Sequence, residues 1–360
     1  MRIAILSTFP DKKCGVGYYT YRLVQELRKS DEIKKLIVIG DLESTKADYM
    51  VDFKSFNLYN HVNEIIANEL IDLIYIEHEY WMYGKTNLGF VMVHKKLDIP
   101  IITKLGAISS NDPGISLLER IRAKVVERVV VKKANKIVVD YGTSEEQLAG
   151  FPIEKIAKIP LGISTASKIE KRKKEGGKKT ILFFGIISHH KGVENIIKSS
   201  KYLKNVRIVI AGRPNMDLKE ILMLKEEYSK YNEIILDFGW IPDDKVKEYF
   251  SNADVVVLPY TRIGIQSGVL YDALSYGVPC VVSRGGMMGT VVNEYGLGAV
   301  VNPTNPEDIA RGITKVFYDY SKYQDNVLKY QKIASWKNVA KMYVGVFREI
   351  LGLGGSVANG

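Results

Sequence analysis

Residues 255–283 read VVVLPYTRIGIQSGVLYDALSYGVPCVVS, and this stretch decides the fold class. It begins with the apolar run VVVL and ends with PCVVS, each with the length and composition of a buried strand. Between them lie a loop that starts with proline, the small-residue turn QSG and a segment with a helical pattern. A strand, a helix and a second buried strand are typical of a parallel sheet covered by helices.

The turn Gln266-Ser267-Gly268 stands where the loop becomes a helix. Backbone N–H groups there have no partner within the helix and the helix dipole favours an anion, so the turn suits a phosphate or diphosphate. One turn further on, Asp272 offers a carboxylate to a sugar attached to that phosphate. A sugar-nucleotide site needs this combination, but an ordinary strand–helix–strand unit explains the stretch equally well.

Strands and helices alternate along the rest of the chain, which predicts an α/β protein with two doubly wound parallel sheets. Strands are expected at residues 3–7, 36–39, 73–77, 99–104, 136–139, 156–160, 180–184, 206–211, 234–238, 255–259, 279–283 and 299–302. Helical patterns include residues 18–29, 117–133, 192–202, 217–230 and 243–251. The polar, basic segment STASKIEKRKKEGGKK separates the two halves and predicts an interdomain linker. A cleft between two such domains is the usual place for a ligand.

Composition narrows the class of protein. The chain has 360 residues, 46% of them apolar and 26% charged, as in an ordinary globular enzyme. No apolar run approaches the roughly 20 residues that span a bilayer. The start, MRIAILSTF, runs directly into a strand pattern without a signal-peptide core. Cys14 and Cys280 lie far apart without metal-ligand spacing, so we expect reduced thiols and a cytoplasmic protein.

The formal net charge of +10 suggests an anionic partner. The chain has no recognised nucleic-acid motif, so a nucleic acid is not expected. An anionic membrane surface and phosphorylated substrates are the other candidates. Abundant lysine, isoleucine and tyrosine with few histidines and cysteines suggest a heat-adapted protein, whose composition would itself explain part of the charge.

A family resemblance emerges from eight segments taken in order. They are CGVGYYTYRLVQEL, LIYIEHEYWMYG, KIAKIPLGI, FFGIISHHKGVENII, VRIVIAGRP, ILDFGWIPDDKVKEYFSNADVVVLPY, QSGVLYDALSYGVPCVVS and SWKNVAKMYVGVFREIL. Together they resemble the retaining glycosyltransferases of family 4, also called group 1, which have the GT-B fold. The resemblance implies two Rossmann-like domains facing across a cleft: 1–164 on the acceptor side and 180–335 on the donor side. It also implies a linker at 165–179, a helix at 336–351 that returns to the first domain, and a disordered tail at 352–360.

The resemblance assigns roles to individual positions. Lys191 matches the lysine that neutralises the donor phosphate, and Asp272 matches the acid that binds the nucleotide ribose. Gly15 and Gly17 match a loop that closes over the donor, although a turn that needs positive φ explains them too. The donor-binding positions implied are Gly15, Gly17, Gly185, Lys191, Gly212, Arg213, Trp240, Ile241, Arg262, Gln266, Ser267, Gly268, Val269 and Asp272.

Three positions depart from the family pattern. Gly264 stands where the first acid of a pair is usual, and Ile186 replaces a common arginine. Leu105 or Gly106 occupies the place of a histidine near the reacting sugar. His78 and Glu79 are then the nearest polar candidates in the first domain, either as acceptor-site residues or as a structural pair. The expected catalytic residues are Lys191, His78 and Glu79.

The expected function is transfer of a hexose from a UDP- or GDP-sugar to a hydroxyl of a sugar, lipid-linked or other acceptor, with retention of configuration. Synthesis of a glycan, glycolipid or polysaccharide would use such a step. Neither a cofactor nor a metal is expected, and the chain contains no Asp-x-Asp motif. The alternatives are a catalytically silent relative, a sugar-nucleotide epimerase of the same fold, and a dinucleotide-dependent oxidoreductase. The last is disfavoured because CGVGYYTY lacks the third glycine of the fingerprint.

The helical segment that starts at residue 117 bears on the membrane question. Arg120, Lys124 and Arg128 recur every four residues, and Leu118, Ile121, Val125 and Val129 line the adjoining face. In relatives that use lipid-linked acceptors, a basic amphipathic helix often docks on the inner face of the membrane. The interpretation we favour is that the apolar face packs on the sheet and the basic face is solvated.

Overall fold

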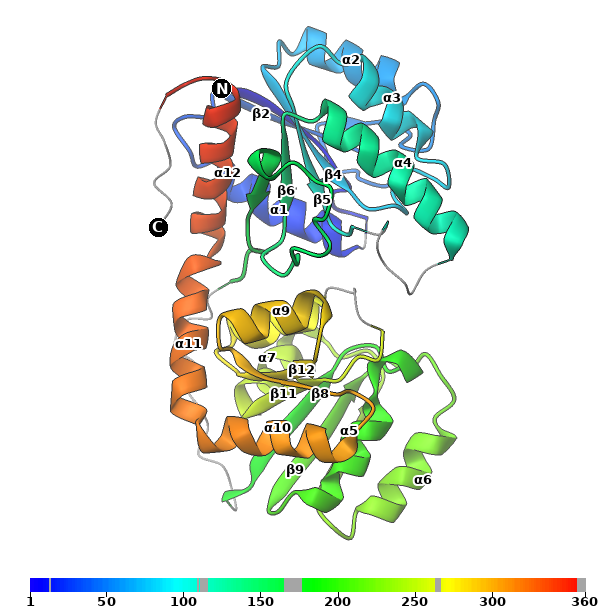
Figure 1. The fold of residues 1–360 in the computed structure, drawn as a ribbon, viewed down its shortest axis with the longest axis vertical. Coiled ribbons are helices and arrows are strands. Elements are labelled where there is room, and N and C mark those ends of the chain that lie inside the picture. Colours follow the sequence, from blue (N-terminus) through cyan, green and yellow to red (C-terminus); the bar gives the residue numbers. More distant parts are fainter. Residues whose placement is uncertain (13, 109, 111–115, 165–176, 263–266, 355–360) are drawn as a thin grey trace. The chain divides into compact units, whose positions relative to one another are not determined.

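The computed structural model describes the whole chain except residues 13, 109, 111–115, 165–176, 263–266 and 355–360. The chain forms two compact units, one made of Met1–Gly162 with Trp336–Gly360 and the other of Ile163–Ser335 (Figure 1). Residues 165–176 of the expected linker and residues 355–360 of the expected tail lie outside the described part. The expected α/β architecture with two parallel, helix-covered sheets is confirmed.

The first unit contains a seven-stranded sheet in the order β3-β2-β1-β4-β5-β6-β7, with every pair parallel. Its strands are β1 (Arg2–Leu6), β2 (Lys35–Gly40), β3 (Tyr49–Met50), β4 (Leu73–His78), β5 (Ile101–Leu105), β6 (Lys136–Val139) and β7 (Ile156–Lys158). Its α-helices are α1 (Gly15–Leu27), α2 (Leu58–Asn68), α3 (Leu88–Lys96), α4 (Leu117–Lys133) and α12 (Trp336–Ile350).

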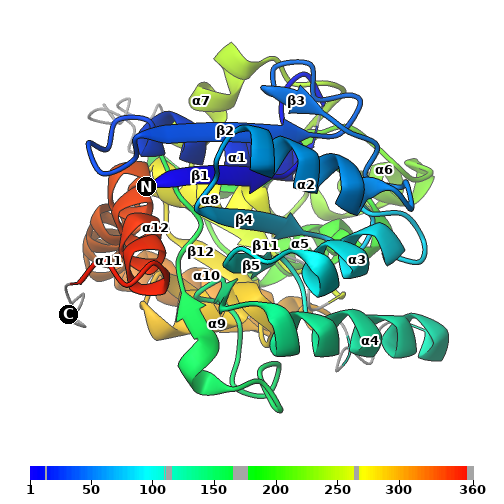
Figure 2. The same cartoon turned by 90° about the horizontal axis from the view of Figure 1, so that it is seen from above.

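Alternate residues of the strands supply two hydrophobic cores in this unit. In β4, Ile74 and Ile76 join the core beneath α2, α3 and α4, whereas Leu73 and Tyr75 join the core beneath α1 and α12. Successive side chains of a strand point to opposite faces, so one strand serves both cores. Figure 2 shows α1 and α12 on one side of this sheet and α2, α3 and α4 on the other.

The second unit contains a six-stranded parallel sheet in the order β10-β9-β8-β11-β12-β13. Its strands are β8 (Lys179–Phe184), β9 (Val206–Gly212), β10 (Glu233–Phe238), β11 (Val255–Leu258), β12 (Cys280–Ser283) and β13 (Gly298–Val301). Its α-helices are α5 (Val193–Ser199), α6 (Lys219–Tyr228), α7 (Asp243–Asn252), α8 (Gly268–Ser275), α9 (Gly286–Glu294), α10 (Pro306–Tyr318) and α11 (Tyr320–Ile333).

The strand order reverses direction once in each sheet, between β1 and β4 and between β8 and β11. In open α/β sheets, ligands bind beyond the carboxyl ends of the strands at such a switch point. Four loops leave the sheets there, after Leu6, His78, Phe184 and Leu258. The fold therefore points to these loops as the places for functional side chains.

Helix α1 begins three residues earlier than expected, at Gly15. Cys14 is the N-cap, and its Sγ accepts a hydrogen bond from the backbone N–H of Gly17 at 3.3 Å. Gly15 and Gly17 thus lie in the first helical turn, not in a loop, and neither has a positive φ. The turn explanation that we kept open for these glycines is therefore wrong.

Helix α4 has the expected bounds, but the expectation that its apolar face packs on the sheet is wrong. Leu118, Ile121 and Val125 are 52–57% exposed. The buried side of the helix consists of Ala123, Val126, Glu127 and Val130. The sequence of α4 therefore contains two apolar stripes with helical spacing. The stripe with Ala123, Val126 and Val130 faces the core, and the stripe with the larger Leu118 and Ile121 is exposed. No described helix is long and apolar enough to cross a membrane.

Candidate active site

Three glycine turns lie side by side at the carboxyl ends of β8, β9 and β10. The N–H of Gly185 donates to the carbonyl of Ala211, and the N–H of Gly239 donates to the carbonyl of Gly212, each at 3.0 Å. Gly185 has φ +113° and Gly212 has φ +142°, and a Cβ on Gly212 would collide with the carbonyl oxygen of Gly185. The glycines thus let the turns pack backbone against backbone, so the expected positions Gly185, Gly212 and Arg213 share one sheet edge.

Lys191 ends a short 3-10 turn, His189–Lys191, that precedes α5. The next residue, Gly192, has φ +69°, and a Cβ there would collide with the carbonyl oxygen of Pro259. The N–H of Thr261 donates to the carbonyl of His190 at 2.9 Å. The lysine turn is therefore bound directly to the loop that follows β11.

The ammonium group of Lys191 is half-buried and lies 3.5 Å from the ring centroid of Tyr260. Burial lowers the pKa of Lys191 to about 8. Within the part of the chain that the structure describes, no carboxylate forms a salt bridge with this ammonium. A desolvated cation without an anionic partner favours the binding of an anion.

Helix α8 begins beside the same tyrosine. Its N-cap is Ser267, whose Oγ lies 2.9 Å from the hydroxyl of Tyr260, and no side chain caps the helix. Among the described residues, the N–H groups of Gly268 and Val269 have no hydrogen-bond acceptor. Further along the helix, Asp272 is exposed at its surface. Desolvation by the surrounding protein nevertheless raises the pKa of Asp272 to about 6. Tyr260 thus contacts Lys191 through its ring and the start of α8 through its hydroxyl.

The remaining expected donor residues are placed less tightly. Trp240 follows the glycine turn at Gly239 and is 78% exposed. Arg213 and Arg262 are exposed, and Ile241 is half-buried. Burial lowers the pKa of His190, and the charges of Lys191 and Arg262 lower it further, so positive charge gathers around this loop. Gln266 and Gly264 lie outside the described residues.

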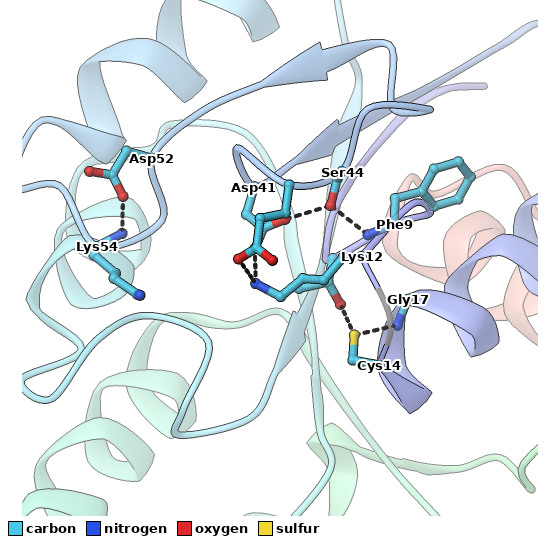
Figure 3. A network of polar contacts seen from close by, with 10 residues as sticks. Phe9, Lys12, Cys14, Gly17, Asp41, Ser44, Asp52 and Lys54 are labelled. Atoms are coloured by element: carbon cyan, nitrogen blue, oxygen red, sulfur yellow. Dashed lines mark hydrogen bonds and ion pairs between the residues drawn. The ribbon is translucent and has the colours of Figure 1, made fainter. Parts of the chain in front are cut away.

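In the first unit, the loop that precedes α1 is held by polar contacts (Figure 3). The ammonium of Lys12 forms ion pairs with Asp41 and Glu43, the latter at 3.1 Å. The hydroxyl of Ser44 donates to Asp41 at 2.6 Å and accepts from the N–H of Phe9 at 2.8 Å. These contacts join the loop after β1 to the loop after β2.

His78 lies in the core of the first unit and is fully buried. Its Nε2 lies 2.9 Å from the amide oxygen of Asn87, and its ring stacks on Tyr83 with the centroids 5.8 Å apart. Burial lowers the pKa of His78 to about 4, so the ring is neutral at pH 7. An enclosed, neutral imidazole supports the structural interpretation, and we leave His78 out of the proposed catalytic group.

Glu79 is placed differently from its neighbour. Its carboxylate fills the space beside Gly106, where a Cβ would collide with Oε1. Burial raises the pKa of Glu79 to about 7, although the charge of Lys104 opposes the shift. A carboxyl group that titrates near neutral pH at the end of β4 can accept or donate a proton.

A buried ion pair that the sequence did not reveal lies behind Glu79. Glu77 and Lys104 are register partners on β4 and β5, 2% and 6% exposed, and their charged atoms approach to 3.3 Å. The Lys104 ammonium also lies 3.8 Å from the ring centroid of Tyr19. Tyr75 donates to Glu77, and the hydroxyl of Tyr343 on α12 lies 3.1 Å from those of Tyr19 and Tyr75. Burial opposes ionisation, but the charge of Glu77 raises the pKa of Lys104 well above its usual value.

Among the described residues, His189, Glu194 and Glu220 form a group whose ligand atoms lie within 4.8 Å of one another. His189 and Glu220 are exposed, and the Nδ1 of His189 already lies 3.3 Å from the buried carboxylate of Glu194. Because exposed groups of this kind are common without an ion, we assign no metal to it.

Comparison with known proteins finds a family similarity within the second unit. Residues 164–333 match the model of the family described as glycosyl transferases group 1. An uncharacterized glycosyltransferase of Methanocaldococcus jannaschii, MJ1607, is 34% identical over 203 residues, which are 52% of this chain and 50% of that protein. The chain thus spans about half the length of the curated relatives it matches. Residues 164–333 are therefore similar to the group 1 glycosyltransferases.

Solved structures agree with this fold. The lipopolysaccharide outer core galactosyltransferase WaaB has a TM-score of 0.72 at 15% identity, over 97% of this chain and 100% of that one. Alr3699/HepE of Anabaena, solved in complex with UDP, has a TM-score of 0.69 at 16% identity, also over 97% and 100%. The expected GT-B fold, with two Rossmann-like units, is therefore confirmed.

Proposed function

We propose that the protein transfers a hexose from a UDP- or GDP-sugar to an acceptor hydroxyl, with retention of configuration. The observation that carries this proposal is the half-buried ammonium of Lys191, unpaired among the described residues and bound through Tyr260 to the uncapped start of α8. A lysine and free helix N–H groups at a switch point favour a diphosphate. The family match and the UDP complex of the HepE neighbour support the same donor class.

The chemistry assigns each group one task. The bond between the sugar's anomeric carbon and the diphosphate breaks, and a bond from that carbon to the acceptor oxygen forms on the same face. The acceptor's proton passes to the departing diphosphate oxygen. Lys191 and the N–H groups of Gly268 and Val269 would stabilise the negative charge that develops on the diphosphate. Asp272 would accept hydrogen bonds from the ribose hydroxyls.

In the first unit, Glu79 is the residue we propose for the acceptor. Its carboxylate would accept a hydrogen bond from the acceptor hydroxyl. With a pKa raised to about 7, the group is partly ionised at neutral pH. The acceptor proton itself goes to the diphosphate, so Glu79 would only orient the hydroxyl. Lys191 and the helix N–H groups would neutralise the diphosphate in place of a metal.

A second candidate function is a silent sugar-nucleotide-binding protein. Leu105 stands where the resemblance places a histidine, and its side chain is 2% exposed, within the core. The protein would then lack the histidine that faces the sugar in relatives, which supports the silent candidate. Both candidates predict nucleotide binding, so only turnover separates them. An epimerase would instead convert a sugar nucleotide without any acceptor.

The outer face of α4 supports a membrane as a further partner. Exposed Leu117, Leu118, Ile121 and Val125 share that face with basic Lys124 and Arg128. Mixed apolar and basic side chains are typical of a helix that lies in the surface of an anionic membrane. Wild-type protein should sediment with anionic liposomes at low salt, and Ile121→Asp with Val125→Asp should abolish sedimentation. If the wild-type protein stays in the supernatant, a soluble acceptor is the better proposal.

Binding and turnover together test the proposed function. A thermal-shift panel of UDP, GDP and ADP with their sugars identifies the donor, because a ligand that binds the folded state raises its melting temperature. Transfer or hydrolysis of that labelled donor is then measured. Lys191→Ala should lower kcat by about a hundredfold or more while the protein stays folded, since removing one such donor typically costs a few kcal/mol. Lys204→Ala, an exposed lysine of the same unit, is the matched control. Full activity of Lys191→Ala would refute the assignment.

A further inference from the structure

The resemblance gives Tyr260 no role, and the proposed mechanism assigns it no step. It is 1% exposed, and burial raises its pKa to about 12, so its hydroxyl keeps its proton. Ser283 donates to its carbonyl oxygen at 2.6 Å, and the next residue, Thr261, donates its N–H to His190 at 2.9 Å. The residue is thus fixed on two sides, and its side chain touches both halves of the proposed donor site.

The hydroxyl of Tyr260 forms a hydrogen bond with Ser267, the N-cap residue of α8. A serine at an N-cap usually bonds the N–H two or three residues on, and this bond adds about 1 kcal/mol to the helix. Ser267 has φ −128° and ψ 116°, the extended conformation from which such a cap forms. Its Oγ nevertheless lies 2.9 Å from Tyr260 and makes no cap. Among the residues that the structure describes, the N–H of Val269, the natural target of that cap, therefore has no acceptor.

The ring of Tyr260 supports Lys191. The ammonium lies 3.5 Å from its centroid, and a cation over an aromatic face is stabilised electrostatically without being neutralised. A carboxylate in the same place would pair with the lysine and compete with an incoming anion. The ring holds the charge in position and leaves it free to bind.

We propose that Tyr260 is a positioning residue that keeps the diphosphate site open. Its ring holds the Lys191 ammonium, and its hydroxyl draws Ser267 away from the N–H of Val269. This proposal rests on the proposed function for the identity of the anion. It is not a catalytic role, since Tyr260 is 1% exposed and acts through Lys191 and Ser267.

The first test is a double-mutant cycle between Tyr260 and Ser267. In Tyr260→Phe the serine is released and caps α8, so an anion must displace the cap. We expect the Kd of the nucleoside diphosphate to rise about fivefold, the equivalent of one cap. In the Ser267→Ala background no cap can form, and the same Tyr260→Phe change should alter Kd less than about twofold. An equal loss in both backgrounds, or no loss in either, would overturn the proposal.

Amide hydrogen exchange tests the same claim without a ligand. The N–H of Val269 should exchange more slowly in Tyr260→Phe than in wild type, and the double variant with Ser267→Ala should return to the fast rate. Unchanged exchange in Tyr260→Phe would show that the hydroxyl does not control the cap. If wild type binds none of UDP, GDP or ADP, the proposed function fails, and this exchange measurement still decides the claim about Ser267.

The role of the ring is tested by Tyr260→Leu against Tyr260→Phe. The leucine variant should bind the nucleotide more weakly than the phenylalanine variant, because only the latter keeps an aromatic face under Lys191. In a Lys191→Met background the two should bind alike. A difference that persists without the lysine would mean that the ring acts on general packing, and melting temperatures of all variants identify any that fail to fold.

Discussion

Removing Lys104 should destabilise the first unit severely, because it leaves the carboxylate of Glu77 buried without a counter-charge. Both residues are at most 6% exposed, and Lys104 supplies the ion pair at 3.3 Å. Breaking a buried pair by deleting one partner typically costs about 3–5 kcal/mol. Against a total stability of about 5–15 kcal/mol, Lys104→Met should bring the unit close to unfolding.

The double variant separates the pair's electrostatics from loss of packing. Lys104→Met with Glu77→Leu removes both charges and takes the carboxylate acceptor from the hydroxyl of Tyr75, which keeps the hydroxyl of Tyr343 at 3.1 Å. Even a fully unsatisfied hydroxyl costs only about 1–3 kcal/mol, so the double variant should be more stable than Lys104→Met alone. Acid neutralises a lone carboxylate, so the defect of Lys104→Met should also be smaller at pH 5 than at pH 8.

Urea unfolding followed by tryptophan fluorescence measures these differences. Of the chain's three tryptophans, Trp81 and Trp336 lie in the first unit and Trp240 in the second, so a Trp240→Phe background reports on the first unit alone. Lys124→Met, at an exposed lysine of α4, is the matched control. A loss below about 1 kcal/mol for Lys104→Met, or a double variant less stable than the single one, would refute the reasoning.

Three further outcomes are expected. Because the pKa of Glu79 is raised to about 7, the free energy of unfolding should be highest below about pH 4.5 and should fall by at most about 3 kcal/mol as pH rises through about 7. Glu79→Gln should remove this fall from a plot of the free energy of unfolding against pH. Donor affinity should fall as pH rises through about 8, where Lys191 loses its proton, and Lys191→Arg should remove this fall in a titration of Kd against pH. Gly212→Ala should cost about 2 kcal/mol or more in thermal unfolding because of its collision and its φ of +142°, whereas Gly239→Ala meets no neighbour and should cost less despite a similar φ.

Much of the fold was predictable because buried parallel strands read as continuous apolar runs. Residues 255–283 gave β11, α8 and β12 in the correct order. The edge strand β3, with only two residues, has no such run and was missed. The exposed face of α4 was misassigned because two apolar stripes run along the same helix, and sequence spacing does not say which of them meets a sheet.

The donor side of the site was partly predictable, because a lysine before glycine and a small-residue turn before a helix are local patterns. Tyr260 was not, since its importance comes from Lys191 and Ser267 meeting it in space. Glu77 and Lys104 were missed for a related reason. Each stands near the end of an apolar strand, where a charged residue usually reaches water, and only the parallel register of β4 with β5 joins them.

The position of α12 in the chain has a consequence for biosynthesis. The first unit needs Tyr343 and Phe347 from α12 to complete the core that faces α1. The 173 residues Ile163–Ser335 separate that helix from the rest of the unit and are translated before it. The second unit is continuous, so a nascent chain can finish it while the first still exposes Leu23 and Tyr75 on the open side of its sheet. Chains truncated after Ser335 and released from the ribosome should therefore carry a folded second unit beside a first unit that chaperones recognise. Protease resistance of the first unit should appear only after α12 has left the exit tunnel.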